Sequence, residues 1–218
     1  MRYKLIDGSA NDVNDIIGTV LRNRGIEKPQ EYLNLTNSCV GDYNDLDNID
    51  RAVECFVEHY NNRDKIAIIP DEDCDGYTSS AMLYLYIKSL DEDYPIEYIL
   101  HDQPKQHGLV DIDLSKFDDA KLIIIADAAT NDANQCNELI SKGKSVIVLD
   151  HHDANYAEES EEEIDYQAAQ YNNAIIVNNQ LSNNYSNKDL SGAGIVYRFL
   201  QALDQELWHD YADNLLDL

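Results

Sequence analysis

Short apolar runs alternate with amphipathic segments along most of the chain after residue 64. The apolar runs predict strands at 65–70, 96–100, 121–126, 145–149 and 173–177. The amphipathic segments predict helices at 78–90, 132–141 and 191–203. Strands that are apolar throughout and alternate with helices are typical of a parallel sheet covered on both faces. The pattern therefore predicts an α/β domain over residues 65–218, built on a parallel β-sheet flanked by helices.

The first 64 residues have a different pattern. Apolar residues recur at helical spacing in 11–24 and again in 46–61, and the polar segment between them is interpreted as a loop. We therefore predict a helical N-terminal region over residues 1–64. At the other end, 208–218 also has helical spacing and stops within an apolar stretch. This end predicts a last helix and a chain that is cut short.

Composition limits the possible functions. The chain has 42 acidic and 16 basic residues, a formal net charge of −26. Such a surface repels polyanions, which by itself argues against nucleic-acid binding. No apolar run approaches the roughly 18 residues of a membrane span, so we expect no membrane association. The four cysteines form no Cys-x-x-Cys pair, which disfavours structural zinc and favours a reducing, cytoplasmic setting.

Acidic and imidazole residues follow three of the predicted strands directly. They are Asp71, Asp73 and Asp75 after the first strand, Asp127 after the third, and Asp150, His151 and His152 after the fourth. The carboxyl ends of parallel strands line one crevice, where open α/β sheets bind ligands. Carboxylates gathered there resist joint ionisation unless they bind cations. Oxygen and imidazole ligands suit manganese or magnesium, so the sequence predicts a site for two divalent ions.

Each group alone has a simpler explanation, such as an acidic or calcium-binding turn for 71–76 or a helix cap for Asp127. The acidic block 157–165 is interpreted as a solvated surface segment. The three groups become informative because they occur together, each after a strand.

These residues also resemble the motifs of a known family, the DHH phosphoesterases. Asp150-His151-His152 after an apolar strand resembles the motif that names the family, and 73–81 is similar to its first motif. Asp127 stands where the family has its second acidic motif. The segment 191–197 resembles a glycine-containing helix of RecJ-type members, and 21–26 and 46–53 also look RecJ-like. The resemblance covers roughly residues 15–218.

The resemblance implies a RecJ-type exonuclease that hydrolyses single-stranded DNA with two Mn²⁺ or Mg²⁺ ions. It implies Asp127 as the bridge between the ions and His152 as the residue facing the scissile phosphate. The expected metal ligands are Asp71, Asp73, Asp75, Asp127 and His151. The expected catalytic residues are Asp127, Asp150 and His152, and the expected substrate contacts are Lys105, His107, Ser191 and Gly192. A single-strand-binding protein is an expected partner, and DNA repair and recombination are the expected processes.

Two alternatives stay open. The first is a DHH phosphodiesterase of short oligonucleotides or cyclic dinucleotides, which the acidity favours, whereas the RecJ-like N-terminal region favours DNA. The second is an inactive DHH-like scaffold that binds partner proteins, which the intact acidic and histidine motifs disfavour.

The sequence also departs from the family's pattern. A later metal-binding Asp and the C-terminal DHH-associated domain of RecJ-type proteins are absent from this chain, which predicts low activity in isolation. Many cellular members have a glycine soon after the second-motif Asp, where this chain has Ala128 and Ala129. That variant points to phage-type members. The net charge of −26 predicts weak, salt-sensitive affinity for DNA.

Overall fold

The computed structural model describes residues 15–34, 40–102, 107–110, 112–155 and 168–216. The chain divides into two compact units, Met1–Val40 and Gly41–Leu218. The first contains α1 (Ile16–Asn23) and α2 (Pro29–Leu33). Helix α2 lies in a segment expected to be a loop, and it begins at Pro29, whose fixed φ suits a first helical position.

A sheet of five parallel strands forms the centre of the second unit, in the order β2-β1-β3-β4-β5. The strands are β1 (Ile66–Pro70), β2 (Ile96–Tyr98), β3 (Leu122–Ala126), β4 (Ser145–Asp150) and β5 (Ile175–Asn178). Each lies at a predicted position, so the predicted parallel α/β fold is confirmed. Because β2 lies on one side of β1 and β3 on the other, the winding of the sheet reverses between β1 and β3.

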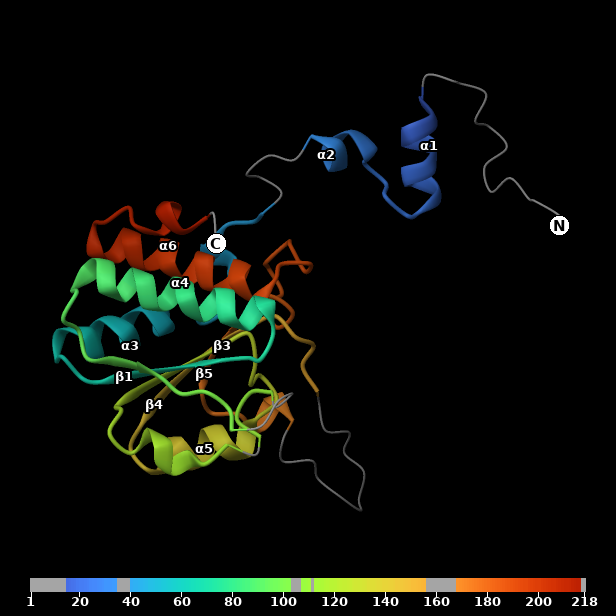
Figure 1. The fold of residues 1–218 in the computed structure, drawn as a ribbon. Coiled ribbons are helices and arrows are strands. Elements are labelled where there is room, and N and C mark those ends of the chain that lie inside the picture. The colour runs from blue at the N-terminus through green and yellow to red at the C-terminus, as the bar shows by residue number, and fades with distance from the viewer. Residues whose placement is uncertain (1–14, 35–39, 103–106, 111, 156–167, 217–218) are drawn as a thin grey trace, which may run out of the picture. The chain divides into compact units, whose positions relative to one another are not determined.

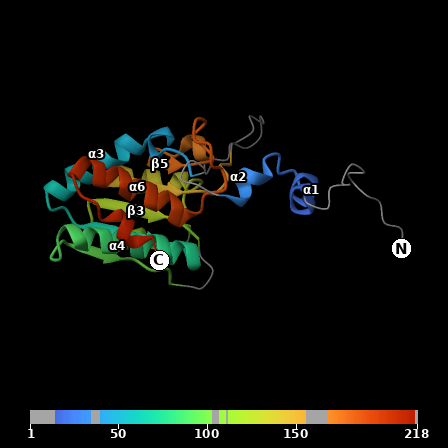
Figure 2. The same ribbon diagram turned by 90° about the horizontal axis from the view of Figure 1, so that it is seen from above.

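Helices cover both faces of this sheet (Figure 1). One face carries α3 (Ile49–Asn61), α4 (Cys74–Leu90) and α6 (Gly192–Leu207), which lie next to one another across the strands (Figure 2). The other face carries α5 (Ala133–Ser141). Successive strand residues point to opposite faces of the sheet. Ile66 and Ile68 therefore belong to the core under α3, α4 and α6, whereas Ala67 and Ile69 belong to the core on the α5 side. The short 3-10 helices are Tyr43–Asp45, Leu114–Phe117, Ala169–Tyr171 and Ala212–Leu215.

The boundaries of three helices differ from the sequence prediction, and α3 begins at Ile49 rather than at residue 46. Helix α4 begins at Cys74 rather than near residue 78, because Asp73 Oδ1 accepts a hydrogen bond from Gly76 N at 2.9 Å and caps the helix. The acidic turn is therefore the first turn of α4. Helix α6 continues to Leu207 and ends where Trp208 adopts a left-handed conformation, with φ of 60°.

The predicted helix over 208–218 is wrong. Up to residue 216, where the description ends, this segment contains only the 3-10 helix Ala212–Leu215. Asp204 stabilises a turn of the chain after α6. Its Oδ2 accepts a hydrogen bond from Ala212 N at 2.8 Å, and its Oδ1 accepts one from the hydroxyl of Tyr86. Ala212 and Leu215 of this short helix are buried against α6 and α4, whereas Leu216 is exposed.

Helix α3, expected in the N-terminal region, packs against β5 and α6 of the second unit. The acidic block 157–165 and Lys105 lie outside the described residues. Within the described ranges, no helix is both long enough and apolar enough to cross a membrane.

Candidate metal centre

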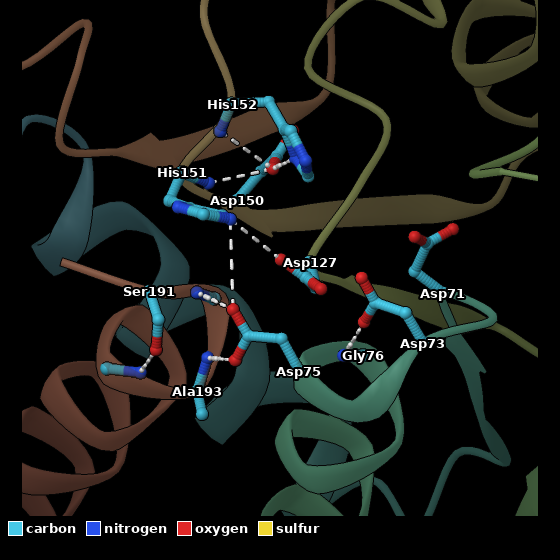
Figure 3. A network of polar contacts seen from close by, with 12 residues as sticks. Asp71, Asp73, Asp75, Gly76, Asp127, Asp150, His151, His152, Ser191 and Ala193 are labelled. Carbon is cyan, nitrogen blue, oxygen red and sulfur yellow. Dashed lines mark hydrogen bonds and ion pairs between the residues drawn. The ribbon is translucent and has the colours of Figure 1, made fainter. Parts of the chain in front are cut away.

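The acidic and histidine groups meet at the carboxyl edge of the sheet, around the ends of β1, β3 and β4 (Figure 3). This edge includes the point between β1 and β3 where the winding reverses. Loops diverge from such a switch point and leave a crevice, which is the usual ligand site of an open α/β sheet. The fold therefore places the candidate residues where a ligand has access.

Asp127 lies at the centre of the group. Its side chain is 1% exposed, and neither carboxylate oxygen accepts a hydrogen bond from any residue that the structure describes. Burial raises the pKa of Asp127 to about 8, and the neighbouring carboxylates of Asp75 and Asp73 add to the rise. Its backbone has a φ of 69°, a strained region for a residue other than glycine. A buried carboxylate that accepts no hydrogen bond from the described residues fits a cation better than it fits a purely structural role.

Asp127 belongs to two groups of residues whose potential ligand atoms lie within 4.8 Å of one another. One group is Asp127, His151 and His152, and the other is Asp71, Asp73 and Asp127. His151 Nε2 lies 3.2 Å from Asp127 Oδ1. Carboxylate oxygens and imidazole nitrogens are suitable ligands for manganese or magnesium. The residues present therefore fit a bound divalent cation, and Asp127 belongs to both groups.

Asp75 has a different environment from the other acids. Its two oxygens accept hydrogen bonds from Gly192 N and Ala193 N, each at 2.8 Å, at the N-terminus of α6. The partial positive charge of a helix N-terminus stabilises such a carboxylate. Asp75 Oδ2 is 3.7 Å from His151 Nε2. The structure thus brings Asp75 to the edge of the site, where it joins α6 to α4.

Ser191 and Gly192, predicted to contact substrate, are bonded within the protein. Ser191 Oγ accepts from Gly194 N at 3.2 Å and caps α6. Gly192 donates to Asp75 and lies close to Asp127: a Cβ atom added at position 192 would be 2.2 Å from Asp127 Oδ1. Gly192 thus lies against two acidic side chains of the site, and Ser191 caps the helix that carries Gly192.

Asp150 and His152 form a bonded pair beside Asp127. Asp150 Oδ1 accepts from His152 Nδ1 at 2.8 Å and from the backbone N–H groups of His151 and His152 (Figure 3). Burial by itself raises the pKa of Asp150, but the hydrogen bonds from His152 and Thr130 outweigh it and lower the pKa to about 2. The same bond raises the pKa of His152 to about 9. The pair therefore holds the His152 ring in one orientation.

His107 and Asp71 form a second pair across the crevice. His107 Nδ1 donates to Asp71 Oδ2 at 2.9 Å, and Gly108 N donates to Asp71 Oδ1 at 3.3 Å. Asp71 is 2% exposed, whereas the His107 side chain is 70% exposed. Both pairs line one open pocket of about 740 Å³, together with Ala128 and Ala129. Two imidazoles thus border the same pocket.

Sequence reasoning missed three residues next to this site: Thr130, Asn178 and Gln180. Thr130 N donates to Asp150 Oδ2, while Asn178 and Gln180 contact the backbone of the two histidines. Asn178 is the first residue after the predicted strand 173–177. The acidic residues were singled out because they directly follow predicted strands, and the same criterion would have identified Asn178. No sequence signal singled out Thr130 or Gln180.

Comparison with known proteins adds independent findings. The family model described as "DHH family, N-terminal domain" matches residues 65–218. The SPbeta prophage-derived protein YorK of Bacillus subtilis (strain 168), whose name describes a single-strand DNA-specific exonuclease, is 42% identical over 219 residues. That match covers all of this chain and 35% of YorK. The single-stranded-DNA-specific exonuclease RecJ of Escherichia coli (strain K12) is 26% identical over 93% of this chain and 34% of its own length.

Solved structures agree on the fold. Exonuclease RecJ bound to manganese matches with a TM-score of 0.62 and 20% identity, over 76% of this chain and 39% of that one. RecJ from Thermus thermophilus in complex with Mn²⁺ matches with a TM-score of 0.60 and 20% identity, over 78% of this chain and 23% of that one. The chain spans about a third of the length of its sequence relatives. Because the family model covers most of the chain and its motif residues meet at one edge of the sheet, the chain belongs to the DHH family, with the family's N-terminal domain in residues 65–218.

Proposed function

We propose that this chain hydrolyses phosphodiester bonds of single-stranded DNA as a RecJ-like exonuclease, using two divalent metal ions. The observation that carries the proposal is Asp127, whose buried and unbonded oxygens are shared by both groups of potential ligands. The names of the 42% identical relative and of the RecJ proteins support exonuclease chemistry on single-stranded DNA.

In this proposal Asp71, Asp73, Asp75, Asp127 and His151 hold the two ions, with Asp127 as the shared ligand. Divalent ions in such a pair supply a nucleophile at neutral pH and stabilise negative charge on the reacting phosphate. Asp150 accepts from His152 Nδ1, so the other ring nitrogen of His152 is available to donate to a phosphate oxygen. Asp150 therefore acts by orienting His152.

Substrate contacts are proposed for the residues bordering the crevice. His107 faces the same pocket as His152 and is bonded to Asp71, which supports a phosphate contact for its imidazole. Lys105 precedes it in the sequence and is proposed as a second phosphate contact. The described bonds of Ser191 and Gly192 are to other residues of the protein. We therefore propose that these two residues act on the substrate indirectly, by fixing the N-terminus of α6 beside the crevice.

The net charge of −26 does not exclude this substrate. Screening at physiological salt confines surface repulsion to about 8 Å. Recognition through bound cations and two imidazoles is local, so it acts within that range. Arg22, a basic residue of the N-terminal unit, forms an ion pair with Asp15 at 2.6 Å.

Manganese is the proposed metal, because RecJ structures with this fold contain it, and magnesium is the alternative. A single-strand-binding protein is the proposed partner, and DNA repair or recombination the proposed process. The described cysteines, Cys55, Cys74 and Cys136, are free, which supports a cytoplasmic setting, and the prophage-derived relative supports a phage origin.

A substrate comparison tests the proposal. The chain is incubated with Mn²⁺ and, separately, with end-labelled single-stranded DNA, a cyclic dinucleotide and pyrophosphate. We expect stepwise release of mononucleotides from DNA, abolished by EDTA and by Asp127→Asn. Asp119 is exposed and precedes β3, at the end of the strand opposite the site, so Asp119→Asn serves as the matched control and should keep the activity.

The other outcomes select the alternatives. Cleavage of the cyclic dinucleotide without cleavage of DNA would identify a small-substrate phosphodiesterase. Manganese binding without hydrolysis of any substrate would identify an inactive scaffold. Hydrolysis that survives Asp127→Asn would exclude the shared-ligand role of Asp127.

A further inference from the structure

The backbone of the His151-His152 dipeptide is held on both sides by side chains. Its two N–H groups donate to Asp150 Oδ1, at 2.7 and 3.1 Å. Its two carbonyl oxygens accept from side-chain amides at and after the end of β5: His152 O from Asn178 Nδ2 at 3.0 Å, and His151 O from Gln180 Nε2 at 3.3 Å. All four polar groups of this dipeptide backbone therefore have side-chain partners.

Asn178 is fully engaged in this arrangement. It is 1% exposed, and its Nδ2 donates both hydrogens, one to His152 O and one to Thr130 Oγ1 at 2.9 Å. Its Oδ1 accepts from Gln180 N at 2.7 Å. A buried amide with all its groups paired has one orientation, because any rotation leaves a polar group unsatisfied.

Thr130 connects Asn178 to the other side of the dipeptide. Its hydroxyl accepts from Asn178, and its N–H donates to Asp150 Oδ2 at 3.0 Å. Thr130 is fully buried and follows Asp127 by three residues. The chain of bonds therefore runs from β5 through the loop after β3 to β4, and it holds the backbone of the two histidines from both sides. A buried and fully satisfied network of this kind is rigid.

We propose that Asn178 and Gln180 are positioning residues that hold the carbonyls of His152 and His151, and thereby aim both imidazoles at Asp127 and the crevice. The inference rests on the proposed function for its catalytic consequence, but not for its structural one. The amide groups suit this role, because a carbonyl oxygen needs a hydrogen-bond donor, and a carboxylate or an apolar side chain at the same position supplies none. The Thr130 hydroxyl accepts a hydrogen bond from Asn178 but can also donate one, for example to an aspartate at position 178. The His152 carbonyl oxygen can only accept, so it loses its partner when the amide is replaced.

Two substitutions at one position isolate the donor. Asn178→Asp keeps the shape and adds charge, and Asn178→Leu keeps the approximate volume without charge. Both lack the donor to His152 O, so an effect shared by both is due to the lost bond. Asn137→Asp and Asn137→Leu are the matched controls, because Asn137 Nδ2 also donates to a backbone carbonyl, Tyr171 O at 2.8 Å. Within the described part of the chain, its hydrogen bonds go to Tyr171 and Asn173 and to neither histidine.

The first readout needs no catalysis. In metal-free protein, NMR signals of the His152 Nδ1–H and of both imidazoles are expected to shift and broaden in the Asn178 variants but not in the Asn137 variants. Titration with Mn²⁺ alone is expected to show about tenfold weaker binding, the usual size of an effect from a group that orients a metal-binding side chain. With DNA, kcat is expected to fall by a similar factor of about ten while KM changes less.

Gln180→Met provides a second, independent variant. Gln180 is partly exposed, so this change should fold even if Asn178 variants do not. We expect it to alter mainly the His151 signal and to weaken Mn²⁺ binding. Histidine signals and Mn²⁺ affinity equal to wild type in the Asn178 and Gln180 variants would overturn the proposal, as would equal losses in the Asn137 controls. Absence of DNA hydrolysis by wild-type protein would instead refute the exonuclease function and leave the NMR and Mn²⁺ results to decide this inference.

Discussion

A Cβ atom on Gly192 would lie 2.2 Å from Oδ1 of Asp127 and 2.5 Å from its Cγ. Real Cβ atoms do not approach other heavy atoms so closely, so the start of α6 and the end of β3 meet at a point that admits only glycine. This close approach also brings Gly192 N to Asp75, at 2.8 Å from Oδ2. Residue 192 thus sets the distance between the helix N-terminus and two acidic side chains of the site.

Gly192→Ala is therefore expected to displace the Asp127 carboxylate and to weaken Mn²⁺ binding by about tenfold or more. Titration calorimetry measures this effect directly. Gly194→Ala is the control on the same helix, because its Cβ would meet the Leu190 side chain instead of an acid. Equal Mn²⁺ affinity in wild type and Gly192→Ala would contradict the close packing seen here.

Asp127→Asn is expected to stabilise the metal-free protein at neutral pH. The pKa of Asp127 is raised from 3.8 to about 8 in the folded protein, so between these values the folded state keeps a proton that the unfolded state has released. The free energy of unfolding therefore falls as pH rises through this window, by up to about 1.4 kcal/mol per pH unit. Urea unfolding in EDTA at pH 5 to 8 should show a shallower decline for the Asn variant.

With bound manganese, the wild-type protein should be more stable than Asp127→Asn, the reverse of the metal-free order. A bound cation favours the ionised carboxylate, so saturating Mn²⁺ should stabilise the wild-type protein and have little effect on Asp127→Asn. A wild-type protein whose stability is equal with EDTA and with Mn²⁺ would argue against a metal site at Asp127.

Asp150→Asn is expected to destabilise the fold by about 3 kcal/mol, because the buried carboxylate accepts four hydrogen bonds and an amide group would turn a donor toward other donors. The pKa of Asp150 is lowered to about 2. Its stabilising effect is therefore present above pH 4 and lost as pH falls from about 4 to 2. Denaturant unfolding at pH 7 and pH 3 should show a smaller difference between variant and wild type at the lower pH.

Ala128 and Ala129 should respond in opposite directions to glycine. Ala129 has a φ of 79°, a left-handed conformation that costs a non-glycine residue about 1–2 kcal/mol, whereas Ala128 has no positive φ. Glycine relieves this strain but also gives the unfolded chain more conformational freedom, which opposes folding. Ala129→Gly should therefore leave the free energy of unfolding unchanged or raise it by up to about 1 kcal/mol. Ala128→Gly should lower stability by a similar amount. Thermal unfolding of the two variants under one condition compares them, and a loss in both would show that residue 129 is not strained.

The sequence alone determined the parallel α/β fold, because strands buried on both faces must be apolar throughout and the chain shows five such runs. It also determined that Asp71, Asp73, Asp127 and His151 meet, because parallel strands bring their carboxyl ends to one edge. Both inferences depend on local patterns whose consequence is fixed by the geometry of a parallel sheet.

Only the tertiary structure decided how each side chain is used. Asp75 bonds to the N-terminus of α6, 117 residues away in sequence, and Asn178 bonds to the carbonyl of His152. The end of α6 is likewise set by Trp208, and the turn that follows it by contacts of Asp204 with Tyr86 and Ala212, rather than by the helical spacing of 208–218. Hydrogen-bond partners distant in the chain leave no periodic signal, because a directional bond depends on where two elements pack and not on the residues beside it.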